Sequence, residues 1–132
     1  MSQEVITLFR YNGAEYEFDA RDADEVERME AAVDKMAEEE REIPKDGRAS
    51  DMYRAQCDML KRFFDRVFGE GAGIALCSEK NNIAVHYDAY EQFLAFVSAQ
   101  KDDVLKARQT FRQISTRPTQ KKAKGIPAPK KK

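Results

Sequence analysis

The segment from Met52 to Cys77 constrains the fold more than any other, because it carries the most apolar helical pattern in the chain. Its apolar residues recur at the three-and-four spacing that gives a helix one apolar face. They are Met52, Ala55, Met59, Leu60, Phe63, Phe64, Val67 and Phe68. Ser50 or Asp51 can cap the start of this helix, and Gly69 and Gly71 can end it. Since such a face must be covered, we expect the other segments to pack on it.

A β-hairpin is predicted from Val5 to Asp19, where residues alternate around Asn12-Gly13, a strong signal for a two-residue turn. One face then carries the pairs Phe9/Tyr16, Thr7/Phe18 and Tyr11/Ala14, and the other carries Arg10/Glu15 and Leu8/Glu17. Because a lone hairpin is only marginally stable in water, its aromatic face should lie on the helices.

Further helices are predicted on both sides of the Met52–Cys77 segment. Asp22 and Glu25 resemble a capping box at the start of a helix that ends near Glu42, before Pro44. A short helix follows from about Ala72 to Glu79. A long helix runs from about Ala84 to Ile114, with apolar residues at heptad spacing interrupted by Gln100. These heptad residues are Tyr90, Phe93, Val97, Val104, Ala107, Phe111 and Ile114.

The length of the last helix leaves two alternatives open. Thirty helical residues span about 45 Å, whereas a compact domain of this size is only about 30–35 Å across. In one alternative the helix breaks near residues 98–103 and folds back on the core. In the other its end extends beyond the core and exposes Val104, Leu105, Phe111 and Ile114, which then need a partner.

The fold class predicted from these segments is mainly α (α+β), with an N-terminal hairpin packed on about three to four helices. Residues 1–116 are expected to form one domain, and residues 117–132 a disordered Lys/Pro-rich tail. The tail holds six Lys, one Arg and no acid, a charge of +7. The other 116 residues hold 16 basic and 24 acidic residues, a net of −8, so an acidic domain carries a basic tail.

The residues that usually carry chemistry are sparse. The chain has two cysteines and one histidine, His86, and their spacing matches no metal-binding motif. The sequence also has no phosphate-binding loop. No aromatic residue lies between the lysines of the tail to stack on bases, which argues against nucleic acid. No apolar run approaches the ~20 residues that span a bilayer. We therefore expect no enzyme, cofactor, metal or membrane association.

What remains is binding through apolar helical faces, to a protein partner or in a homo-oligomer. The candidate partner-binding residues are Tyr90, Phe93, Val97, Val104, Leu105, Phe111 and Ile114. Tyr90 and Phe93 belong to this set only if they lie outside the core.

Several motifs in residues 6–100 resemble those of a known class of phage proteins. They are NGxEYEFD, DADxxxRMExA and RAQCDxxKRFFDRVFGEG, followed by DAYEQFLAFV. Together they are similar to small tail assembly chaperones of long-tailed phages and prophages of Gram-positive bacteria. The resemblance ends at about Lys101.

This resemblance implies a non-catalytic protein of the host bacterial cytoplasm. Tail assembly chaperones bind the long helical tape-measure protein through apolar surfaces and keep it soluble while the tail forms. Two alternatives stay open. The acidic domain would also suit a phage-encoded inhibitor or adaptor that binds a host defence or regulatory protein, and the chain could be a structural tail subunit.

Overall fold

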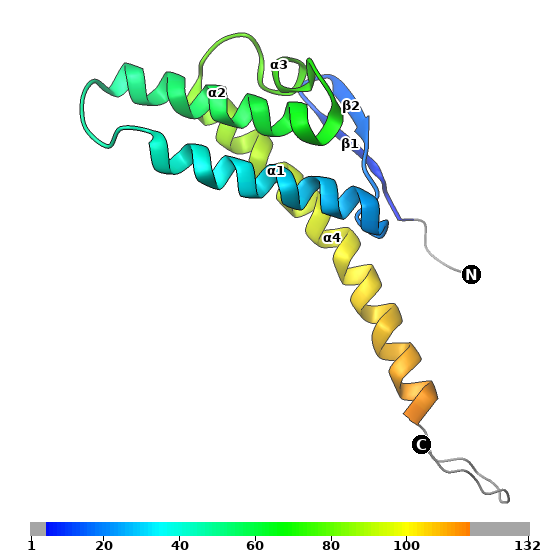
Figure 1. Ribbon diagram of the computed structural model, residues 1–132. Helices are drawn as coiled ribbons and strands as arrows, with labels where there is room; N and C mark the ends of the chain where they lie inside the picture. Colours follow the sequence, from blue (N-terminus) through cyan, green and yellow to red (C-terminus); the bar gives the residue numbers. More distant parts are fainter. Residues whose placement is uncertain (1–4, 117–132) are drawn as a thin grey trace, which may run out of the picture. The chain divides into compact units, whose positions relative to one another are not determined.

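The computed structural model describes residues 5–116, which form a two-stranded hairpin and four helices (Figure 1). The elements are β1 (Leu8–Tyr11), β2 (Ala14–Glu17), α1 (Ala23–Glu42), α2 (Ala49–Phe68), α3 (Ala72–Cys77) and α4 (Ile83–Thr116). The predicted fold class, mainly helical with an N-terminal hairpin, is confirmed. The tail predicted for residues 117–132 lies outside the described residues.

Two compact units divide the chain after Lys101: an N-terminal unit, Met1–Lys101, and a C-terminal unit, Asp102–Lys132. The predicted organisation, one domain over residues 1–116 followed by a tail, stays a prediction.

The hairpin has the predicted register. Phe9 pairs with Tyr16, Tyr11 with Ala14, and Leu8 with Glu17 across an antiparallel ladder. The turn fits Asn12-Gly13 because both residues have positive φ, 55° and 84°, which asparagine and glycine tolerate best. Beyond the ladder the Phe18 amide still donates to the Thr7 carbonyl at 2.8 Å.

Helix α1 begins as predicted after Asp22, whose carboxylate accepts from the Asp24 amide at 2.8 Å. The predicted capping box is only half formed. Glu25 does not reach back to the amide of Asp22; its carboxylate accepts from the amide of Asp19 at 2.8 Å. It therefore ties the hairpin exit, and not the cap itself, to the first turn of α1.

Helix α2 starts earlier than the pattern suggested and without the predicted cap. Its N-cap is Arg48, which makes no side-chain hydrogen bond there, so Ser50 and Asp51 lie inside the first turn. Gly69 ends the helix as predicted, with φ 116°. Glu39 of α1 joins the two helices by accepting from Arg62 at 3.2 Å and from Arg66 at 2.7 Å.

Helix α3 is shorter than predicted and lies unusually close to α2. A Cβ atom built on Gly73 would overlap the backbone carbonyl of Lys61, so only glycine fits at this contact. The Asp65 carboxylate accepts from the Gly73 amide at 2.7 Å and holds the two helices together.

Helix α4 begins where Asn82 accepts from the amides of Ala84 and Val85 through its side-chain oxygen. The helix is continuous to Thr116, with no break near residues 98–103. Its residues up to Lys101 belong to the N-terminal unit and the rest to the C-terminal unit.

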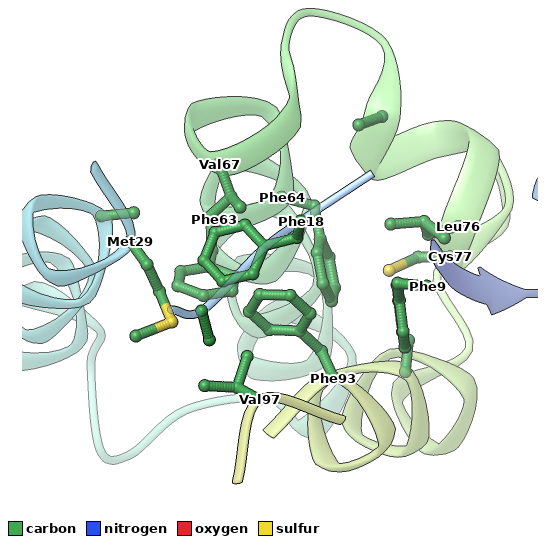
Figure 2. Close-up of a cluster of buried hydrophobic side chains, with 14 residues drawn as sticks. Phe9, Phe18, Met29, Phe63, Phe64, Val67, Leu76, Cys77, Phe93 and Val97 are labelled. Carbon is green, nitrogen blue, oxygen red and sulfur yellow. The ribbon is translucent and has the colours of Figure 1, made fainter. Parts of the chain in front are cut away.

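The core of the N-terminal unit is built around the ring of Phe93, which is fully buried (Figure 2). Its centroid lies 5.3–6.3 Å from those of Phe9, Phe18, Phe63, Phe64, Phe68 and Phe96. Most of these pairs meet edge to face, the arrangement in which the positive ring edge meets the negative face. Hairpin, α2 and α4 thus share one aromatic cluster.

A buried amide fixes the hairpin to α4. Gln100 is 2% exposed, and its oxygen accepts from the Ala20 amide. Its nitrogen donates to the carbonyls of Ile6, at 2.8 Å, and Phe18, at 3.0 Å. Gln100, which interrupts the heptad pattern, is therefore a buried polar side chain whose oxygen and nitrogen both hydrogen-bond to backbone groups that flank the hairpin.

We predict that Gln100→Ala lowers the free energy of unfolding by about 3 kcal/mol, because two buried backbone groups and one part-buried group lose their partner. Gln92→Ala is the matched control, since Gln92 lies exposed on the same helix and its replacement should cost no more than about 0.5 kcal/mol. Urea denaturation of both variants measures the difference. Equal losses would mean that the Gln100 amide does not hold the hairpin.

Candidate protein-binding surface

The C-terminal unit presents apolar side chains that no other described residue covers. Phe111 is 69% exposed, Ile114 61%, Leu105 54% and Val104 40%. Every residue from Lys101 to Ser115 is exposed. These four residues, all predicted from the sequence as candidate partner-binding residues, thus remain accessible.

Three of the four residues share one helix face. Val104, Ala107, Phe111 and Ile114 recur at three-and-four spacing and form what we call the apolar strip. Leu105 follows Val104 directly and so points about 100° further around the helix, beside the strip. The strip is narrow, of the kind found at the seam between two helices.

The remaining candidate residues lie in the N-terminal unit, where two are buried and one is half-buried. Phe93 and Val97, 0% and 4% exposed, belong to the hydrophobic core, so their assignment to a binding surface is corrected. Tyr90 is half-buried, its ring 5.2 Å from that of Phe63, and burial raises the pKa of its hydroxyl. Heptad spacing alone could not separate these residues from the exposed ones, since both sets follow the same period.

The edges of the apolar strip differ in charge. Arg108 and Arg112 lie along one edge, and Asp103 and Thr110 along the other. All four side chains are exposed. Two arginines therefore lie along one edge of the strip, and none along the other.

The groups that most often carry catalysis are buried in the N-terminal unit. His86 is 0% exposed, and its Nδ1 lies 2.7 Å from the Asn82 carbonyl oxygen, so Nδ1 carries the proton. Its Nε2 is buried without a partner among the described residues. Cys57 and Cys77 are free and buried, and burial raises the pKa of the Cys77 thiol to about 12. Both thiols thus stay protonated at neutral pH, unlike an activated nucleophile.

The described residues of the N-terminal unit line shallow depressions on its surface. One is lined by Tyr16, Arg28, Arg66 and Phe68 among others. Both arginines are engaged, because Arg28 donates to the Val67 carbonyl at 2.9 Å and Arg66 pairs with Glu39. The second depression lies between β1 and α4, beside Leu8, Arg10 and Phe96.

Among residues 5–116, no group of three or more His, Cys, Asp or Glu side chains is placed to hold a metal ion. Within the same part of the chain, no helix combines the length and apolar character needed to cross a membrane.

Comparison with known proteins identifies a family. A model of the Family of unknown function (DUF6673) matches residues 12–125. Neither a curated protein nor a solved structure matches the chain.

We predict that His86 makes stability depend on pH. Burial lowers its pKa in the folded state below the ordinary value of 6.5. The unfolded chain then binds more protons below about pH 6.5, so the free energy of unfolding should fall as the pH falls. The slope attributable to one histidine is at most about 1.4 kcal/mol per pH unit.

Chemical denaturation of the protein and of His86→Gln between pH 7.5 and 5.5, a window set by that ordinary value, checks this prediction. The variant lacks the titrating ring and should show a flatter dependence on pH, whatever its absolute stability. If the free energy of unfolding depended on pH equally in the protein and in the variant, the prediction would be wrong.

Proposed function

The chain belongs to the DUF6673 family, whose function is unknown, and from this premise we propose that it is a non-catalytic protein that binds helical segments of a client. The client we propose is a phage tape-measure protein, kept soluble by this chain in the bacterial cytoplasm during tail assembly. The binding surface would be the apolar strip on α4, with Leu105 beside it.

The exposure of the apolar strip is the observation that carries this proposal. Phe111 and Ile114, 69% and 61% exposed, are large side chains of a kind that soluble surfaces seldom group together. Burial of the apolar strip against a second helix would remove this apolar surface from water.

The size of the strip supports a client that is bound by many copies. Four residues over about 15 Å of helix cover far less than the ~800 Å² that each partner of a stable one-to-one complex buries. A long client with repeated apolar stripes overcomes this weakness, because several copies bound along one chain add avidity. A tape-measure protein is a client of this kind, and the motif resemblance in residues 6–100 points to the same class.

The proposal is tested by co-expression with the long helical protein encoded beside this gene, followed by size-exclusion chromatography with light scattering. We expect the long protein to become soluble and to elute with several copies of this chain. Phe111→Asp/Ile114→Asp should abolish co-elution, because two carboxylates would enter the apolar strip.

Gln109→Asp/Gln113→Asp is the matched control. It adds the same charge to the same helix at exposed positions outside the strip, and should leave co-elution intact. Both variants should melt within a few degrees of the parent, as expected for exposed sites. Precipitation of the long protein in every case, with this chain eluting alone, would reject the chaperone proposal and favour a host target bound by the acidic N-terminal unit.

A further inference from the structure

The contact between α2 and α3 fixes how the two helices are aligned. The Asp65 carboxylate on α2 accepts from the amide of Gly73, near the start of α3. The Lys61 ammonium group, one turn earlier on α2, donates to the side-chain oxygen of Asn81 beyond the end of α3, at 3.1 Å. The two helices therefore run antiparallel. A Cβ atom on Gly73 would lie 2.7 Å from the Cα atom of Lys61, so the two Cα atoms are no more than about 4 Å apart.

This alignment brings the two cysteines together. Cys57 lies four residues before Lys61, and Cys77 lies four residues after Gly73, so each is one turn along on the same side of its helix. In an antiparallel pair these two turns lie at the same level. Helices that cross at the common angles of about 20° and about 50° diverge by roughly 2 to 5 Å over one turn. The Cα atoms of the two cysteines are then about 4.5–6 Å apart, within the range of about 4.4–6.8 Å that a disulfide spans.

The electrostatic surroundings of Cys77 agree with this alignment. Burial is the main cause that raises the pKa of its thiol to about 12, the charge of Lys61 opposes the shift, and a negative charge on Cys57 adds to it. Burial also raises the pKa of the Cys57 thiol, and Lys61 again opposes the shift. Both sulfur atoms therefore lie near the same ammonium group and near each other. In this structure both are free thiols, and both side chains are buried.

We infer that Cys57 and Cys77 form a reversible disulfide across the contact between α2 and α3 when the chain meets a small-molecule disulfide such as oxidised glutathione. One thiolate attacks the oxidant, forms a mixed disulfide and releases one glutathione. The second thiolate attacks the protein sulfur of the mixed disulfide, forms the S–S bond and releases the other glutathione. The two cysteines lose two electrons and two protons, which the two glutathione molecules take up. This redox site is separate from the proposed helix binding by the apolar strip.

The bond joins two helices that otherwise meet through noncovalent contacts. It closes a loop of about 20 residues, which contains the second half of α2 and the whole of α3. Because this loop restricts the unfolded chain, the oxidised protein should be more stable than the reduced one. In a reducing compartment the thiols stay free. The oxidant reaches the buried sulfur atoms only when α3 moves away from α2, so the reaction should be slow.

Equilibration with mixtures of reduced and oxidised glutathione tests the inference. The full chain is incubated in buffer and in concentrated urea, quenched with acid and weighed by mass spectrometry, where the disulfide lowers the mass by two hydrogen atoms. The fold favours the bond by the same factor by which the bond favours the fold. We therefore expect the equilibrium constant for disulfide formation to be about a hundredfold larger in buffer than in urea. A constant that is equal in both, or larger in urea, would overturn the inference.

Ile74→Cys/Cys77→Ala is the matched control. It keeps two cysteines on the same two helices, but Ile74 is 52% exposed and lies on the outer side of α3. A disulfide between Cys57 and this new position should form no more readily in buffer than in urea. The same hundredfold preference in this variant would mean that the compactness of the chain, and not the contact between α2 and α3, drives the reaction. That result would also overturn the inference.

The product of the unaltered chain gives an independent check. The oxidised protein should melt about 10 °C higher than the reduced protein and should return to the lower melting temperature with dithiothreitol. A product of doubled mass, or one that carries a glutathione on each cysteine, would show that the two thiols do not reach each other and would overturn the inference. None of these measurements involves a client, so a failure here is distinguishable from a failure of the proposed function.

Discussion

The hairpin of this protein has only two strands, and its position depends on one buried amide. The side chain of Gln100 pairs with a backbone group of Ile6, just before β1, and with backbone groups of Phe18 and Ala20, just after β2. Once these ends are held, Phe9 and Phe18 stay against the ring of Phe93. The aromatic core and the polar contact therefore support each other, since neither would be well placed without the other.

The division of the chain by contacts coincides with a division by charge. The N-terminal unit has 13 basic and 22 acidic residues, a net of −9, and the C-terminal unit a net of +8. The near-neutral total of −1 hides this separation. Such a chain joins two segments of opposite net charge, so its association with other molecules should depend on salt even though its net charge is small.

Much of the fold could be predicted from local patterns. The hairpin register followed from Asn12-Gly13 and alternation, and the ends of α1 followed from Asp22 and Pro44. The cap of α2 could not be predicted, because Arg48 occupies it without a side-chain bond and no residue type marks such a start. The burial of His86 also lay beyond sequence reasoning, since a lone histidine on a helix has no pattern that separates inside from outside.

The candidate surface shows the same limit more sharply. Phe93 and Val97 follow the period that Phe111 and Ile114 follow, yet the first two are buried and the last two exposed. The periodicity of apolar residues indicates which side of a helix is apolar, but not where along the helix other elements stop covering that side. Gln100 was the available signal, because a polar residue on an apolar face marks a place where the packing changes.

The contacts of Gln100 also bear on how the chain reaches its fold. The amide joins residues 80 to 94 positions apart in sequence, so the hairpin, although local in its own pairing, is held in part by the far end of the N-terminal unit. Closing so long a loop costs chain entropy before any contact compensates it. The docking of the hairpin should thus be a late step that waits for α4, and folding should be slower than for a helical protein with only neighbouring contacts.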